Sequence, residues 1–222
     1  RMRFSIHIVF IVVFVSFLSV LANEFYQVEQ QDHQSIIINF TFPKPDISPL
    51  DKNSSTALFT IPGLPYNYRE AEPLLPIFSK AIVVPPGPIS WKIISIEKQS
   101  LNNIYPIIYY PADDQQTPLL TSALPPVYPQ NIVQLQEAGI FRDYRILGLT
   151  VYPIQLTPQG LFYYKNIEIK IIFPETSNQT AASIPADESR LLKHLAINDP
   201  QRSNISPAIS MAPANSFAQN QS

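Results

Sequence analysis

Residues 167–173, with the sequence IEIKIIF, carry a pattern with a period of two. The large apolar side chains at positions 167, 169, 171 and 173 fall on one side of an extended chain, and Glu168 and Lys170 fall on the other. Because successive side chains of a strand point to opposite faces, this pattern predicts a strand with one buried face and one face in water.

Six other segments are rich in Ile, Val, Tyr, Phe and Thr, the residues that strands prefer. They are residues 35–42, 57–61, 81–84, 91–96, 104–110 and 144–152. Many of the 23 prolines lie in the intervals between these segments, and Pro donates no hydrogen bond to a sheet. We therefore predict an all-β fold over residues 35–175, in which two antiparallel sheets pack as a β-sandwich. A closed barrel is the alternative, but it would favour fewer segments interrupted by Pro.

The composition excludes several classes of function. The 222 residues include no Cys, so the chain has no disulfide, no thiolate metal site and no cysteine nucleophile. A formal net charge of -2 provides no basic surface for phosphates, which argues against nucleic acid as a partner. A chain of this length with 45% hydrophobic residues can bury a core of its own.

The N-terminus has the pattern of a signal peptide. Arg1 and Arg3 precede an apolar run that ends in Val-Leu-Ala at residues 20–22. Small residues at the end of such a run suit a signal peptidase, so we predict cleavage between Ala22 and Asn23. The alternative is an uncleaved anchor, because about 18 apolar residues approach the length that spans a bilayer. We expect a secreted, extracellular protein that meets the membrane only during export.

The remaining segments differ from the strand-rich part. Residues 23–34 are predicted to be a flexible N-terminal segment, and residues 176–200 a linker with one short helix. That helix, predicted over residues 187–197, places Leu191, Leu192 and Leu195 on one side. Residues 201–222 consist largely of Ser, Asn, Gln, Ala and Pro, and this composition predicts a disordered linker.

The sequence contains no recognisable catalytic motif. It has no Gly-x-Ser-x-Gly elbow, no His-Glu-x-x-His helix and no Gly-rich phosphate loop. Asp113 and Asp114, with Asp32 and Asp143, could be imagined as a calcium site, but the first two are more typical of a solvated turn. We therefore expect no catalytic residue, no metal and no cofactor on this chain.

Two groups of residues have both a structural and a functional interpretation. Residues 142–145, Arg-Asp-Tyr-Arg, favour a local ion pair at the start of a strand, and a docking patch is the alternative. Trp91 and the Tyr pairs at residues 109–110 and 163–164 could stack on sugars. Aromatic residues at strand spacing are more often part of a core.

Two blocks of the sequence together resemble one family. Residues 72–87, EPLLPIFSKAIVVPPG, are followed by a strand with the sequence SWKII, and residues 141–155 read FRDYRILGLTVYPIQ. This order, with the helix that ends in Ala-Ile-Asn-Asp-Pro at residues 196–200, resembles the N-terminal propeptide of gingipain-type cysteine peptidase precursors. The resemblance extends over residues 61–200.

The resemblance implies a role without catalysis on this chain. Propeptides of this family are β-sandwiches that assist folding of the peptidase and block its cleft until they are cut away. The partner would be the cognate cysteine peptidase domain, bound in cis or as a non-covalent complex. The full precursor would then be a cysteine-type endopeptidase, whereas this chain is not an enzyme.

The resemblance also indicates candidate contact residues. In members specific for Arg or Lys, a loop before the second block presents a basic residue to the specificity pocket. The matching residues 125–137 contain no Lys or Arg, which leaves Leu124, Tyr128 and Ile132 as apolar candidates for an inhibitory loop. Arg202 is the candidate for the activation cut. The alternative function is a secreted β-sandwich module that binds glycans or a cell surface.

Overall fold

The computed structural model describes residues 25–49, 57–69, 72–101, 127–141, 144–174 and 186–199. In these ranges the chain forms antiparallel strands and a short C-terminal helix, α2. The elements are β1 Tyr26–Gln31, β2 Ser35–Thr41, β3 Asp46–Pro49, β4 Ala57–Thr60, β5 Phe78–Val84, β6 Ser90–Leu101, β7 Val133–Phe141, β8 Tyr144–Val151, β9 Ile154–Thr157, β10 Gly160–Ile172 and α2 Ala186–Leu195.

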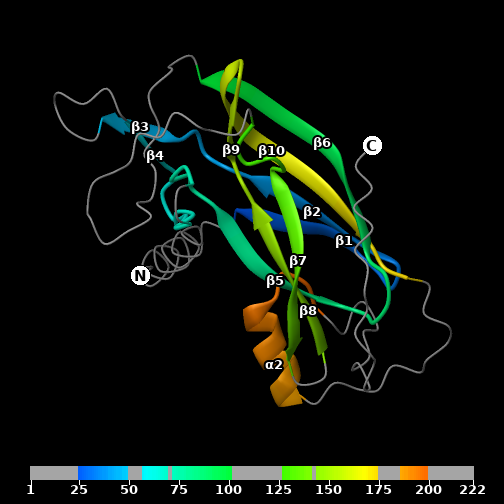
Figure 1. Ribbon diagram of the computed structural model, residues 1–222. Coiled ribbons are helices and arrows are strands. Elements are labelled where there is room, and N and C mark those ends of the chain that lie inside the picture. The colour runs from blue at the N-terminus through cyan, green and yellow to red at the C-terminus, as the bar shows by residue number, and fades with distance from the viewer. Residues whose placement is uncertain are drawn as a thin grey trace, which may run out of the picture.

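Two sheets lie face to face and share one core (Figure 1). The larger sheet has the order β1-β2-β10-β6, with β9 paired to β10, and the smaller sheet has the order β5-β8-β7. Strands β3 and β4 form a separate hairpin. The core contains side chains from both sheets, such as Ile38 and Ile169 from the larger and Ile82 and Leu149 from the smaller. This arrangement confirms the predicted all-β antiparallel sandwich.

Strand β10 is the central strand of the larger sheet, as the alternation in residues 167–173 indicates. Ile167, Ile169 and Ile171 have no exposed surface and face the smaller sheet. Strand β10 pairs with β2 on one side and with β6 on the other, so both rows of its backbone groups are hydrogen-bonded. The large apolar side chains therefore build the core around a strand with no free edge along these residues.

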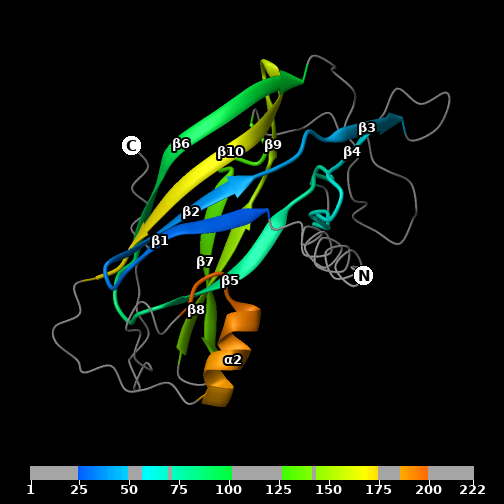
Figure 2. The ribbon, with the colours of Figure 1, turned by 180° about the vertical axis from the view of Figure 1, so that it is seen from behind.

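A long hairpin links the two sheets. Strands β7 and β8 pair in the smaller sheet, and the chain then continues through Tyr152 and Pro153 into β9, which pairs with β10 of the larger sheet. The segment before β7 follows the same course, because Tyr128 forms an antiparallel bridge with Leu156 of β9. One end of the sandwich is therefore joined by a shared hairpin, and α2 lies near the opposite end (Figure 1 and Figure 2).

The prediction of a flexible segment over residues 23–34 is wrong for β1. Strand β1 pairs with β2 along its length, and its Tyr26 ring packs against Phe40 and Phe78. The Lys80 ammonium lies 4.9 Å from the centre of the Tyr26 ring and donates to its hydroxyl at 3.1 Å. The many Gln and Glu residues of β1 hid the strand, because one of its faces lies toward water.

Helix α2 is present, but its buried side differs from the predicted one. Leu192 is 1% exposed, whereas Leu191 is 36% and Leu195 is 46% exposed. The buried row consists of Ser189 and Leu192 of α2 and of Ala196, the residue that follows the helix. This row packs against Val83 of β5 and Tyr144 of β8, so a single row of side chains is enough to hold α2 on the smaller sheet.

Several predictions concern residues outside the described ranges. These are the signal peptide, the cleavage site at Ala22 and Asn23, the strand over residues 104–110 and the linker over residues 201–222. Within the described part of the chain, no helix has the length and apolar character needed to cross a membrane.

Candidate functional site

Both ends of the segment between β6 and β7 are attached to the same hairpin. Leu101, the last residue of β6, pairs with Leu161 of β10, and Leu161 pairs with Leu156 of β9. On the other side of Leu156, two backbone hydrogen bonds of 2.9 and 2.6 Å connect this residue to Tyr128. Leu101 and Tyr128 therefore lie in register on four neighbouring backbones, those of β6, β10, β9 and the segment before β7.

The β9–β10 turn that holds these ends is built by local polar contacts. The Thr157 hydroxyl donates to the carbonyl of Gly160 at 3.0 Å and accepts from the backbone N–H of Gln159 at 3.2 Å. Gly160 has a φ of 117°, in the region that favours glycine. Pro158 restricts the backbone of the turn, so the hairpin that holds Leu101 and Tyr128 is rigid at its tip.

Tyr128 is fixed by a buried network with two polar side chains from residues 67–72. Its hydroxyl donates to Glu72 Oε2 at 2.6 Å and accepts from Asn67 Nδ2 at 2.6 Å. Asn67 Nδ2 also donates to the same Glu72 oxygen at 2.9 Å. Burial and the neighbouring Glu72 carboxylate raise the pKa of Tyr128 well above its usual range, so the phenol remains a hydrogen-bond donor. Tyr128 is thus held by its side chain as well as by its backbone.

A hollow of about 570 Å³ opens beside this network. It is lined by Arg69, Glu72, Val127, Tyr128, Pro129, Gln130, Gln134 and Tyr152. One guanidinium and one carboxylate give the lining no net charge, and its other polar groups are amides and phenols. Such a set of groups can bind a chain segment, but it contains no nucleophile paired with a base. Across the described ranges, no three His, Asp or Glu side chains gather in a way that could hold a metal ion.

The structure changes the interpretation of the predicted inhibitory residues. Tyr128 is 8% and Ile132 is 7% exposed, and both belong to the core of this domain. They are therefore not available to fill a pocket on a partner in this conformation. Residues 133–137, which were expected to be part of a loop, belong to strand β7. Leu124 and the cleavage candidate Arg202 lie outside the described residues.

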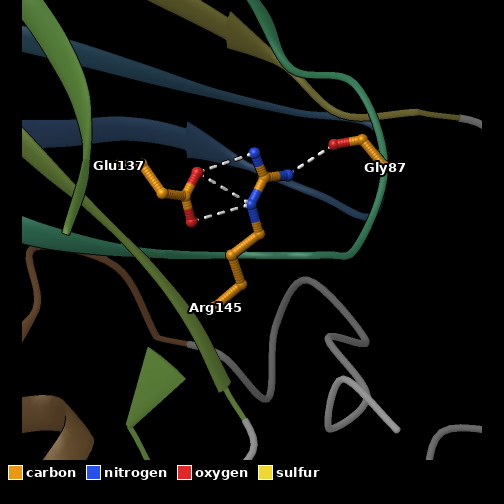
Figure 3. A network of polar contacts seen from close by, with 3 residues as sticks. All are labelled: Gly87, Glu137 and Arg145. Carbon is orange, nitrogen blue, oxygen red and sulfur yellow. Dashed lines mark hydrogen bonds and ion pairs between the residues drawn. The ribbon is translucent and has the colours of Figure 1, made fainter. Parts of the chain in front are cut away.

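The two sequence blocks meet at Arg145 (Figure 3). Its guanidinium donates from Nε to Glu137 Oε1 at 3.1 Å and from Nη2 to Glu137 Oε2 at 2.9 Å. Nη1 donates to the carbonyl of Gly87, in the turn between β5 and β6. The expected ion pair at the start of a strand is thus formed by Arg145 with a residue of the neighbouring strand. Arg142 and Asp143 lie outside the described residues.

Two of the aromatic candidates for sugar stacking, Tyr163 and Tyr164, are part of the core. Tyr163 is 2% and Tyr164 is 6% exposed. The Tyr163 hydroxyl donates to the carbonyl of Phe42, and the Tyr164 hydroxyl donates to Gln155 Oε1 at 2.5 Å. Trp91 is half-buried against the core, and Tyr109 and Tyr110 lie outside the described residues. The alternative that these rings are structural is therefore confirmed for Tyr163 and Tyr164.

Of the residues considered for a calcium site, Asp32 is described, and its carboxylate shapes a turn. Its Oδ1 accepts from the backbone N–H groups of Gln34 at 2.8 Å and Ser35 at 2.7 Å, between β1 and β2. These hydrogen bonds lower the pKa of Asp32, because they favour its charged form. Asp113, Asp114 and Asp143 lie outside the described residues.

A family model and two solved structures are similar to this chain. The family model Propeptide_C25 matches residues 22–187. The structure is similar to a chain in the complex of the RgpB pro- and mature domains from Porphyromonas gingivalis, with a TM-score of 0.63 and 16% identity, over 79% of this chain and 98% of that one. It is also similar to a chain in a structure that concerns the zymogenic latency of gingipain K from Porphyromonas gingivalis, with a TM-score of 0.54 and 23% identity, over 67% of this chain and 92% of that one. A search of the curated proteins finds no match. Because the family model extends over most of the sequence and the fold agrees, the chain belongs to the Propeptide_C25 family.

Proposed function

We propose that this chain is the propeptide of a gingipain-like cysteine peptidase precursor. In this role it binds the peptidase domain of its own precursor, assists its folding and blocks its active site until proteolysis separates the two. The family assignment supports this role, and so does the similarity to the complex of the RgpB pro- and mature domains and to the structure that concerns the zymogenic latency of gingipain K. The peptidase cysteine has to lie elsewhere in the precursor, because these 222 residues contain no Cys.

The observation that carries the inhibitory part of the proposal is that Leu101 and Tyr128, at the two ends of one segment, are both held by the β9–β10 hairpin. A segment held at both ends loses less conformational entropy on binding than a free tail, which favours its use as an inhibitor. Residues 99–141 contain no Lys or Arg. The residue that this segment presents to the peptidase pocket is therefore neither Lys nor Arg, and the apolar Leu124 is our candidate for it.

Titration of the mature peptidase with residues 23–222 tests the inhibition. We expect loss of peptidase activity at an inhibitor concentration close to that of the enzyme. Leu124→Asp should weaken inhibition, because a carboxylate would have to enter an apolar pocket without a partner. The matched control is His33→Ala, because His33 is exposed in the β1–β2 turn. This turn lies near Ile172, at the opposite end of β10 from Leu161 and its partner Leu101. Full peptidase activity at about 1 μM inhibitor would refute the proposal.

Refolding tests the chaperone part separately. Denatured peptidase domain is diluted into buffer with or without residues 23–222, and recovery of its native circular dichroism is followed. We expect a higher native yield with the propeptide, because a partner that binds the folded state shifts the equilibrium toward it. An equal yield in both samples would leave this chain an inhibitor without a folding role.

We further propose that the precursor is exported through the signal peptide at residues 1–22. The family model begins at residue 22, directly at the predicted cut between Ala22 and Asn23. N-terminal sequencing of the secreted protein should find Asn23 as its first residue. Sequencing of the separated propeptide should find Arg202 at its new C-terminus if that residue is the site of activation.

A further inference from the structure

The last described residues lie along the outer edge of strand β5. In the smaller sheet, whose order is β5-β8-β7, one side of β5 pairs with β8 and the other faces residues 196–198. Ala196 forms a parallel bridge with Ala81, and the backbone N–H of Ile197 donates to the carbonyl of Ala81 at 2.9 Å. The chain that follows α2 therefore extends the smaller sheet by a short parallel segment.

Asn198 continues this pairing with its side chain. The backbone N–H of Val83 donates to Asn198 Oδ1 at 2.9 Å, and Asn198 Nδ2 donates to the carbonyl of Val83 at 2.7 Å. A carboxamide carries one carbonyl acceptor and one N–H donor side by side, the same pair that a peptide unit of a neighbouring strand presents. Asn198 is 2% exposed, so these hydrogen bonds are shielded from water. The edge of β5 thus recognises an asparagine through backbone groups alone.

Apolar contacts anchor the same segment, residues 192–199, which we call the C-terminal strap. Leu192 and Ala196 pack against Val83 and Tyr144 on the outer face of the smaller sheet. Ile197 is 8% exposed and belongs to the main core. The strap therefore places apolar side chains in two separate clusters, on both sides of the edge that Asn198 occupies.

The end of the strap contacts the larger sheet. The backbone N–H of Asp199 donates to Gln31 Oε1 at 3.2 Å, and Gln31 Nε2 donates to the Asp199 carbonyl. The Asp199 carboxylate lies 3.2 Å from the Lys193 ammonium, so an ion pair joins the two ends of the strap. Because Gln31 is the last residue of β1, the strap crosses from the edge of one sheet to the edge of the other.

We propose that the edge of β5 is a binding site for an extended peptide with asparagine as its recognised residue, occupied in cis by the chain's own strap. The apolar contacts and the hydrogen bonds of Asn198 are enough to hold the strap even when the chain between β10 and α2 is cut. A cut between β10 and α2 would leave the strap bound as a separate peptide, and a cut beyond Asp199 would leave it in place. This inference does not depend on the peptidase partner proposed above.

A nicked protein tests the site with every contact intact. A recognition sequence for a specific protease is inserted between Ser183 and Ile184 of residues 23–222, and the purified protein is then cut. We expect the C-terminal piece to remain with the sandwich in size-exclusion chromatography at about 1 μM. Separation of the piece at this concentration would overturn the proposal, whether or not the remaining domain stays folded.

Competition then tests the role of asparagine. A synthetic peptide of residues 186–200 should displace the labelled C-terminal piece from the nicked protein. The same peptide with Asn198→Ala should compete about ten-fold less well or worse, because two shielded hydrogen bonds are lost. The matched control is a peptide with Leu195→Ala, a change at a side chain that is 46% exposed, and it should compete like the natural peptide. Since the changes are in the peptide, the folding of the domain is unaffected, and equal competition by all three peptides would overturn the proposal.

Discussion

The guanidinium of Arg145 donates to the backbone carbonyl of Gly87, although 58 residues separate them in the sequence. The same guanidinium holds the Glu137 carboxylate, so one side chain joins the β5–β6 turn to the β7–β8 hairpin (Figure 3). Gly87 has a φ of 107°, and a Cβ at this position would lie 3.1 Å from the Pro174 side chain, so a larger residue would be strained here. The two sequence blocks on which the family resemblance rests are therefore in direct contact.

Arg145→Ala should destabilise the domain by about 1–3 kcal/mol, because it removes charge-assisted hydrogen bonds from a side chain that is 14% exposed. The free energy of unfolding in urea measures this loss. The matched control is Lys165→Ala, which breaks the pair with Glu97 in which both side chains are nearly half exposed. That change should cost less than about 1 kcal/mol. Equal losses for the two variants would contradict the structural role of Arg145.

Tyr128→Phe should destabilise the domain by about 1–2 kcal/mol. The ring remains, but Asn67 and Glu72 lose their shared hydroxyl partner in a buried network. Urea unfolding measures the change, and Tyr68→Phe is the control because Tyr68 is 62% exposed. If Tyr128→Phe were as stable as the control, the hydrogen bonds to Asn67 and Glu72 would not contribute to stability.

The domain should lose stability as the pH rises above about 10. Burial raises the pKa of Tyr163 to about 12, and burial together with Glu72 raises the pKa of Tyr128 further. Unfolded tyrosines ionise near pH 10, so the stability from the neutral phenols is complete below that pH. This stabilisation is lost as the pH rises from about 10 toward the higher pKa values of the same tyrosines in the folded protein.

Alkaline titration can follow this loss with two signals. Tyrosinate absorbance from the buried rings should appear together with the loss of native circular dichroism. Full ionisation of all tyrosines near pH 10, with the native spectrum preserved, would show that these rings are accessible to water.

Leu192→Ala should cost about 2–4 kcal/mol, because Leu192 is buried between α2 and β5. Leu191→Ala, one residue away and 36% exposed, should cost less than about 1 kcal/mol. Hydrogen exchange of the Ile197 amide reports the strap directly, since this amide donates to Ala81. Faster exchange in Leu191→Ala than in Leu192→Ala would contradict the orientation of the helix.

The sequence by itself determined the class of the fold. The alternation in residues 167–173, the β-branched segments and the prolines between them predict short antiparallel strands, and the structure has them. The order of two sequence blocks was enough to indicate the family. These features are local, because strand alternation is a property of neighbouring residues in one segment.

Only the tertiary structure decided how distant segments are used. Strand β1 has a polar sequence, and it is a strand because its backbone pairs with β2 and its Tyr26 ring packs against Phe78. Leu192 is buried and Leu191 exposed because α2 meets one edge of one sheet. Tyr128 was predicted to contact a partner from an inhibitory loop, yet its hydroxyl is hydrogen-bonded to Asn67 and Glu72 inside this domain. Asn198 is hydrogen-bonded to Val83, which is 115 residues away in the sequence. A local sequence pattern cannot predict this contact, because the two residues become neighbours only when the sheets have formed.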